Sequence, residues 1–593
     1  MNKQIYLGNT ALNSNQLDVD GRFIDIQGEK FYKISNYNYM PDFFMTIVSD
    51  SDHWLFISSN GSLSAGRKDR DNALFPYYTV DKIHDYCGIT GSKSILQVEK
   101  ADKVFLWEPF SKELAAIYNI ERNLYKSEYG NNVIFEEINH DLEVTFKYGW
   151  YFSEEFGFVK KSFLLNHGAD TTKIELLDGI TNLLPTGVDY NFQNEYSNLL
   201  DGYKKNELIE DTGLGLFMLS SIPVDKAEPS ESLNATTVWS SELPNKKIIL
   251  CNKQIQNFRN GYSVETELDI KGNRGSYFVN TQLELEQHQE HHWMIVAEIN
   301  QDSSQVANLN QLIQDQQNLT ELVNTNITKG TAHLIQIVGA ADGLQSTNEE
   351  LCYVRHYSNT LFNIMRGGTY LDNYEINTDD LKKFVVQRNQ KISIEFTSQL
   401  NQLPATVNRQ ALIEFASDTD NAALIRICYE YLPLTFSRRH GDPSRPWNLF
   451  SIDNKEKDGT PKSDYQGNWR DIFQNWEALC LSYPEYIESI ISKFVNATTA
   501  DGYNPYRIMR EGIDWESPDE DDPWAYIGYW GDHQIIYLQK LLELSDQYHP
   551  GKLNELLGKD IFAYANVPYR IKPYSEIIKD PSDTIEFDHT LNT

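Results

Sequence analysis

Two stretches of this 593-residue chain concentrate side chains that could bind a sugar or an anion. The first, Ser437-Arg-Arg-His-Gly-Asp-Pro-Ser-Arg-Pro-Trp-Asn448, is rich in Gly and Pro and cannot be helical throughout. A guanidinium group binds phosphate, carboxylate or vicinal hydroxyls with two parallel hydrogen bonds, and a loop can aim several such groups at one point. The candidates are Arg438, Arg439, Asp442 and Arg445. A surface loop held by ion pairs is the alternative.

The second stretch, Tyr465-Gln-Gly-Asn-Trp-Arg-Asp-Ile-Phe-Gln-Asn-Trp-Glu-Ala-Leu479, has the spacing of an amphipathic helix. Its apolar face consists of Ile472, Phe473, Trp476, Leu479 and Cys480. A solvated face usually carries Lys and Glu, whereas this helix offers the donors, acceptors and stacking rings of a sugar site. These candidates are Trp469, Arg470, Asp471, Gln474, Asn475 and Trp476. An ordinary amphipathic helix with its polar side in water is the alternative.

Aromatic and polar residues of the same types continue further along the chain, and six of the eleven tryptophans fall between Trp447 and Trp530. Arg507 and Trp515 join the candidates from Asp501–Arg507 and Gly512–Glu516. Asp532 and His533 precede an apolar helical pattern, so Asp532 is also a plausible helix N-cap. A helix N-terminus aimed at a pocket would favour an anion as well.

Charge and cysteine content narrow the class of protein. A formal net charge of −33 argues against nucleic acid and anionic membranes as partners, because phosphate binding requires clustered Lys and Arg. Neutral sugars are indifferent to net charge, whereas phosphate would need a local positive pocket. The five cysteines lack metal-ligand spacing, and the chain does not begin with a signal peptide. We expect a reduced, cytoplasmic protein without a metal or cofactor.

The order of expected elements indicates several domains. Short aromatic-rich runs separated by Asn/Gly/Asp turns predict a large antiparallel β-sandwich over residues 1–300. Residues 301–345 predict a helical linker, with one connecting helix over 305–326. Residues 346–593 are expected to be mainly helical. The expected helices there span 349–366, 378–388, 408–416, 420–430, 468–480, 484–496 and 532–545.

Ser437–Asn448, Gly467–Glu477 and Gly528–Leu542 resemble the cellobiose phosphorylase group, glycoside hydrolase family 94 and its larger β-glucan phosphorylase relatives. The resemblance covers residues 350–593 well and residues 1–300 loosely, through Ser51–Tyr78. It implies an N-terminal β-sandwich (a supersandwich), a helical linker and an (α/α)6 barrel, of which residues 346–593 would form the first part. The family is usually homodimeric and belongs to the six-hairpin glycosidases.

The chemistry implied by the resemblance is inverting. Inorganic phosphate, as co-substrate, attacks the anomeric carbon while an aspartic acid protonates the departing glycosidic oxygen. The Arg-Asp element that grips the sugar at the scissile bond matches Arg470-Asp471, and Gln474 would contribute there. Arg438, Arg439 and Arg445 would bind sugar or shape the phosphate pocket. Trp469, Trp476 and Trp515 would serve as stacking platforms.

The sequence departs from the family in two places. Asn475 stands where the shorter members have an acidic residue, and the Trp-Asn-Asp motif that carries the general acid is absent from this chain. We therefore expect that acid beyond Thr593, in a longer or split protein. Three functions remain open. They are phosphorolysis of a β-linked glucan or disaccharide releasing glucose 1-phosphate, inverting hydrolysis on the same fold, and non-catalytic carbohydrate binding by a half-enzyme without its acid.

Overall fold

The structure of the protein is a computed structural model that describes residues 4–13, 17–222, 232–315, 318–439, 441–445, 449–456, 459–516 and 534–592. Internal contacts divide the chain into two compact units. The first comprises residues 1–335 with 441–450, and the second comprises residues 336–440 with 451–593. The units are described separately, and the domain boundaries expected at residues 300 and 345 remain predictions.

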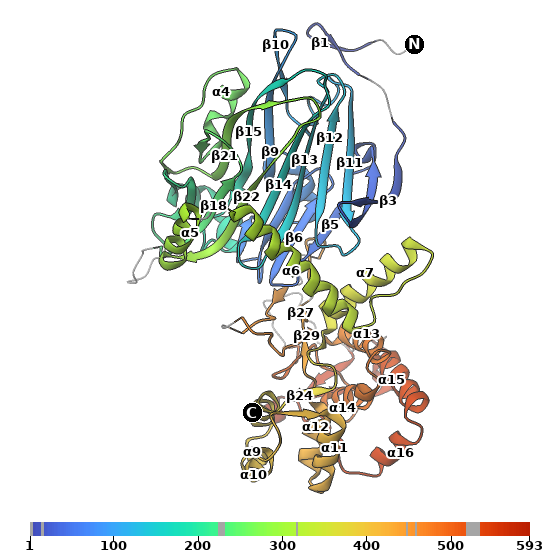
Figure 1. Ribbon diagram of the computed structural model, residues 1–593. Coiled ribbons are helices and arrows are strands. Elements are labelled where there is room, and N and C mark those ends of the chain that lie inside the picture. Colours follow the sequence, from blue (N-terminus) through green and yellow to red (C-terminus); the bar gives the residue numbers. More distant parts are fainter. Residues whose placement is uncertain are drawn as a thin grey trace. The chain divides into compact units, whose positions relative to one another are not determined.

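The first unit is built on antiparallel sheets, as its aromatic and β-branched runs predict (Figure 1). A short hairpin, β1 (Tyr6–Leu7) and β2 (Thr10–Ala11), lies near the N-terminus. The largest sheet described has eleven strands. Their order is β20 (Asp269–Lys271), β16 (Lys204–Ile209), β17 (Leu214–Leu219), β18 (Asn234–Ser241), β22 (Glu290–Asp302), β14 (Gly157–Asn166), β13 (Val144–Ser153), β12 (Val133–Asn139), β11 (Ile120–Ser127), β4 (Glu29–Ser35) and β3 (Asp20–Ile26).

Two smaller sheets complete the β structure of the first unit. One has the order β10 (Lys103–Trp107), β9 (Gly91–Lys100), β15 (Thr172–Leu183), β21 (Gly275–Leu285) and β19 (Lys247–Ile249). The other has the order β5 (Phe44–Val48), β6 (His53–Ser58), β7 (Leu63–Arg67) and β8 (Ala73–Phe75). Short helices lie in the connections, namely α1 (Val80–Asp85), α2 (Tyr190–Glu195), α3 (Ser197–Tyr203) and α4 (Ile255–Arg259). The prediction of a large antiparallel β region is confirmed.

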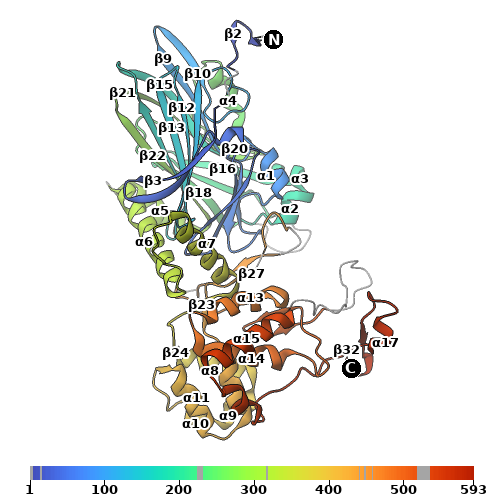
Figure 2. The ribbon, with the colours of Figure 1, turned by 90° about the vertical axis from the view of Figure 1, so that its right-hand side faces the viewer.

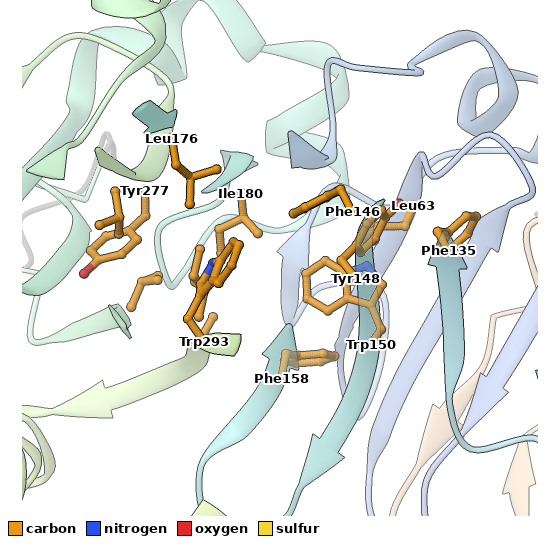
Figure 3. Close-up of a cluster of buried hydrophobic side chains, with 14 of the residues drawn as sticks. Leu63, Phe135, Phe146, Tyr148, Trp150, Phe158, Leu176, Ile180, Tyr277 and Trp293 are labelled. Atoms are coloured by element: carbon orange, nitrogen blue, oxygen red, sulfur yellow. The ribbon is translucent and has the colours of Figure 1, made fainter. Parts of the chain in front are cut away.

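The core of the first unit joins all three sheets. Leu63 of β7, Trp150 of β13, Leu176 of β15 and Trp293 of β22 belong to one cluster of buried side chains (Figure 3). Each of these side chains is at most 1 % exposed. Because inward-facing residues alternate along each strand, sheets that pack face to face share a single apolar interior. The aromatic residues of this cluster therefore fill the core of the first unit.

Two helices follow the sheets. The sequence predicts one connecting helix over residues 305–326, whereas the structure has α5 (Ser303–Asp315) and a longer α6 (Leu319–Ala340). Leu319, Val323 and Ile327 of α6 repeat at helical spacing and pack against buried residues of the large sheet. This pattern continues to Leu334 and Val338, which explains why α6 extends beyond the predicted end. Among the described residues, no helix combines the length and apolar character needed to cross a bilayer.

The second unit is mainly helical (Figure 2). Its described helices are α7 (Glu350–Gly367), α8 (Thr378–Arg388), α9 (Gln390–Glu395), α10 (Thr397–Leu400), α11 (Arg409–Asp418), α12 (Ala422–Glu430), α13 (Trp469–Cys480), α14 (Ile487–Ala497), α15 (Gln534–Tyr548), α16 (Lys552–Leu557), α17 (Tyr574–Ile577) and α18 (His589–Asn592). All seven helices expected from the apolar spacing are present, and α8 has the predicted bounds. The partial (α/α)6 arrangement of these helices remains a prediction.

Short paired strands lie between the helices of this unit in the sequence. The pairs are β23 (Thr369–Tyr370) with β26 (Leu434–Thr435), β24 (Glu375–Asn377) with β25 (Thr406–Asn408), β27 (Arg438–Arg439) with β28 (Ser451–Ile452), and β32 (Tyr569–Ile571) with β33 (Ile585–Phe587). A further sheet has the order β29 (Gln466–Asn468), β30 (Arg507–Met509) and β31 (Ile513–Asp514). Since β23 pairs with β26, the intervening chain leaves and returns at one point. Residues 371–433 therefore form a closed excursion that contains α8 to α12.

Asparagine caps start several helices of this excursion. The side chain of Asn421 accepts hydrogen bonds from the backbone amides of Ala423 and Leu424, at 3.1 and 3.0 Å. Such a cap satisfies amides that have no partner inside the helix. Asn421→Ala is expected to cost about 1 kcal/mol of local stability. Hydrogen-exchange mass spectrometry should show about fivefold faster exchange for the α12 amides.

The matched control is Asn421→Ser, because serine also caps helices well and should leave the exchange of α12 nearly unchanged. Equal exchange in the Ala and Ser variants would show that the cap does not stabilise α12.

Candidate functional site

Helices α7 and α13 enclose a cavity of about 480 Å³ in the second unit, together with the segment that follows α6. Its floor is apolar and includes Leu344, Ile364 and Leu479. Cavities that bind small ligands have about this size and combine an apolar lining with a few placed polar groups. The polar side chains here are Asp342, Gln345, His356, Asn359, Thr360, Asn363, Asn475 and Ser482.

Asn475 is the most constrained polar group of the cavity. Its Nδ2 donates to Asn363 Oδ1 at 2.9 Å, and its side chain is only 6 % exposed. Within the described residues, the buried Oδ1 of Asn475 accepts no hydrogen bond. A buried amide oxygen without a donor is costly.

Close packing of α7 on α13 positions this pair of amides. A methyl group at Gly367 would lie 3.0 Å from Asn475 Cβ and 3.1 Å from Trp476 Cδ1, so any larger residue would require α13 to shift by a few tenths of an ångström. Trp476 Nε1 donates to the Gly367 carbonyl at 2.7 Å and fixes the register of the two helices. The sequence therefore brings Asn363 and Asn475 together through one glycine and one indole.

Three other predicted residues on α13 precede Asn475. Arg470 and Gln474 are exposed, and Asp471 is half-buried. Because residues four apart share a helical face, Asp471 lies next to Asn475 on the side of the cavity. Arg470, Asp471 and Gln474 thus place a guanidinium, a carboxylate and an amide on the N-terminal half of α13, and these three residues are not among those that line the cavity. This arrangement can donate to and accept from the hydroxyls of a polyol.

The prediction that Trp469 and Trp476 form stacking platforms is wrong. Both side chains are 0 % exposed, and the Trp469 ring packs against Phe473 and Phe494. These indoles belong to the core because Phe494 of α14 packs on Trp469 and Gly367 of α7 contacts Trp476. Trp515 is half-buried and stacks on Tyr569, with ring centroids 5.4 Å apart. That stack is part of a separate aromatic cluster.

The predicted arginines outside α13 are held by other groups. Arg507 Nε donates to Asp514 Oδ2 at 2.8 Å, which ties β30 to β31. The Arg438 guanidinium lies 4.9 Å from the centroid of the Phe436 ring. Arg439 extends β27, and its side chain lies outside the described residues. The described contacts thus do not bring Arg507 and Arg438 to the cavity.

Asp442 and Arg445 belong to the first unit. Phe450 anchors this segment by packing on Trp54, with ring centroids 5.4 Å apart. Asp442 accepts a hydrogen bond from the Ser444 amide at 2.7 Å, and Arg445 is exposed. Asp532 and His533 lie outside the described residues.

Seven of the eight polar side chains of the cavity are not among the residues predicted from the sequence, and four of the seven lie on α7. His356, Asn359, Thr360 and Asn363 recur every three or four positions on α7 and form one polar stripe. That periodicity was visible in the sequence, although the helix itself looked like an ordinary amphipathic one. Among the described residues, no group of three or more His, Cys, Asp or Glu side chains is arranged to hold a metal ion.

Residues 370–433 match the family described as glycoside hydrolase family 149 insertion domain 1. The match coincides with the excursion closed by β23 and β26, so the structure shows why this segment behaves as an insertion. No curated protein matches the sequence.

Several solved structures are similar to the chain at low identity. A bacterial glucoamylase complexed with acarbose is 10 % identical, with a TM-score of 0.36, over 92 % of this chain and 68 % of its own. A putative kojibiose phosphorylase from the human microbiome is 11 % identical, with a TM-score of 0.31, over 90 % of this chain and 64 % of its own. A family GH92 α-mannosidase from Bacteroides thetaiotaomicron is 10 % identical, with a TM-score of 0.21, over 42 % of this chain and 29 % of its own.

The matched insertion domain supports the resemblance to glycoside hydrolases but not the assignment to family 94 in particular. At that coarser level, the chain is related to carbohydrate-active enzymes.

Proposed function

We propose that this chain carries the sugar-binding residues of an inverting phosphorylase that cleaves a β-linked glucan or disaccharide and releases glucose 1-phosphate. The observation that supports the proposal is the polar cavity between α7 and α13, which Asn475 of α13 lines. A neutral sugar needs both donors and acceptors over an apolar floor, and this cavity offers them. The chain's strong negative charge does not oppose a neutral substrate.

The proposed reaction needs few groups from the protein. An oxygen of inorganic phosphate forms a bond to the anomeric carbon while the glycosidic C–O bond breaks, and a carboxylic acid protonates the departing oxygen. Configuration inverts because the phosphate approaches from the face opposite the leaving group. Arg470, Asp471, Gln474 and Asn475 would hold the sugar ring beside the broken bond. The proposal assigns binding and orientation to these residues and leaves the general acid unassigned.

Inverting hydrolysis is a second candidate, because the matched insertion domain belongs to a glycoside hydrolase family. In that case water replaces phosphate as the nucleophile and a general base is required. The two reactions differ in their product, since hydrolysis yields free glucose without phosphate.

The test is an assay of the protein encoded by the complete reading frame on β-linked glucose oligosaccharides, with and without inorganic phosphate. We expect glucose 1-phosphate only when phosphate is present. The reverse reaction should lengthen β-linked acceptors when glucose 1-phosphate is supplied. Release of glucose at the same rate in both conditions would identify a hydrolase. Binding without turnover in any condition would indicate a carbohydrate-binding protein.

A further inference from the structure

Three cationic side chains of the second unit meet at one buried aromatic ring. Lys493 of α14 is 2 % exposed, and its Nζ lies 5.3 Å from the centroid of the Phe384 ring. The guanidinium carbons of Arg388 and Arg510 lie 5.4 and 5.8 Å from the same centroid. Lys493 Nζ is also 5.3 Å from the centroid of Tyr465. Three basic side chains thus lie around one buried ring, two of them buried and Arg388 half-buried.

Four buried donor atoms of this cluster have no acceptor among the described residues. In the parts of the chain that the structure describes, no hydrogen bond is made by the buried atoms Lys493 Nζ, Arg388 Nε, Arg510 Nε and Tyr465 Oη. An ammonium and a guanidinium can only donate, so they cannot satisfy one another. Buried polar groups are nearly always hydrogen-bonded, and a cluster of exceptions indicates an unplaced ligand or water.

Two acids lie near this cluster, and one of them is the counter-ion of Arg510. Asp380 accepts from Arg510 Nη2 at 2.7 Å and from the Tyr431 hydroxyl at 2.6 Å. Glu430 accepts from Asn496 Nδ2 at 2.6 Å. No ion pair to Lys493 is present among the described residues, where such a pair would need a nitrogen–oxygen distance of 4.0 Å or less. The charge on Lys493 therefore has no direct counter-ion.

Electrostatics agree with this geometry. Burial, reinforced by the charges on Arg388 and Arg510, lowers the pKa of Lys493 well below its usual value, and the charge on Glu430 only partly opposes that shift. Burial also raises the pKa of Asp464, which makes that carboxyl a weaker counter-ion. A bound negative charge would favour the protonated form of Lys493 and supply the missing acceptor.

We propose that Lys493, Arg388, Arg510 and Tyr465 form a binding site for a small inorganic anion. A water molecule would accept hydrogen bonds but would leave Lys493 without a direct counter-ion. A sugar would bring donors to a place that already has too many. The depth of Lys493 favours a small ion such as chloride or sulfate. This site is separate from the proposed sugar cavity and does not depend on the cleavage reaction.

The test is thermal unfolding of the whole chain at constant ionic strength, with sodium gluconate replaced stepwise by sodium chloride or sodium sulfate. Phosphate is omitted because the proposed reaction would itself bind it. We expect the midpoint of unfolding to rise by about 3 °C or more for each tenfold increase in a small anion above its Kd. Gluconate is too large for a buried site and should have no such effect.

Lys493→Met is the decisive variant, because methionine has a similar length and no charge. It should lose the response to chloride and sulfate, while Lys540→Met on α15 should keep it. Tyr465→Phe removes one hydroxyl and should weaken anion binding about tenfold, which provides a test if Lys493→Met does not fold. The proposal is overturned if the wild type responds equally to gluconate and the small anions, or if Lys493→Met and Tyr465→Phe respond as the wild type does.

Discussion

Replacing Asp178 with alanine is expected to destabilise the first unit by about 3–5 kcal/mol. Asp178 of β15 accepts hydrogen bonds from Lys160 Nζ of β14 at 2.6 Å and Trp293 Nε1 of β22 at 2.7 Å. Ser94 Oγ of β9 donates to the same carboxylate at 2.5 Å. Lys160 and Asp178 are both 0 % exposed, so the variant leaves an ammonium buried without its counter-ion. Thermal or urea unfolding of the purified chain measures the loss.

The pH dependence of the stability of Asp178→Ala provides a second readout. Burial lowers the pKa of Lys160, and the charge on Asp178 opposes that shift. Without the Asp178 carboxylate, the pKa of folded Lys160 falls further. Between that lowered pKa and the pKa of an unfolded lysine, about 10.4, the unfolded state binds more protons than the folded state. The stability deficit of Asp178→Ala should therefore shrink as the pH rises toward that value.

The matched control removes both charges. Lys160→Met combined with Asp178→Leu should recover a large part of the lost stability, because no buried charge remains unpaired. That double variant should also lose the pH dependence. An Asp178→Ala variant within about 0.5 kcal/mol of the wild type would show that Lys160 finds another partner.

The helices were predictable because their signal is local. The apolar positions Ile472, Phe473 and Trp476 alone predict a helix near residues 468–480, and α13 spans Trp469–Cys480. The order of the sheets was not predictable in the same way. Strand β15 pairs with β9 and β21, which are far away in the sequence, and short-range periodicity carries no information about such partners.

Burial explains where the site predictions failed. Trp469 is of a residue type that often stacks on sugar rings, but Phe494 of α14 packs against its indole ring. The sequence of residues 465–479 does not reveal that contact. Lys493 is the opposite case. Its helix is buried on every side, from Ile487 to Phe494, so a lysine that looks like a surface residue in the sequence lies in the interior. Asn475 was predicted as a binding residue, and it lines the cavity.

Arg470→Ala is expected to reduce turnover of β-linked oligosaccharides about 100- to 1000-fold in the protein encoded by the complete reading frame. Arg470 is exposed on the first turn of α13, whereas the neighbouring Trp469, Ile472 and Phe473 are buried. The fold therefore depends on those neighbours, and the variant should keep its melting temperature. Arg470→Lys should be intermediate, because lysine keeps the charge but loses the planar pair of donors. Lys391→Ala, on the exposed side of α9, is the control and should leave kcat and KM unchanged. If Arg470→Ala turned over substrate as fast as this control, Arg470 would have no part in the site, and the proposed placement of the sugar beside α13 would have to be abandoned.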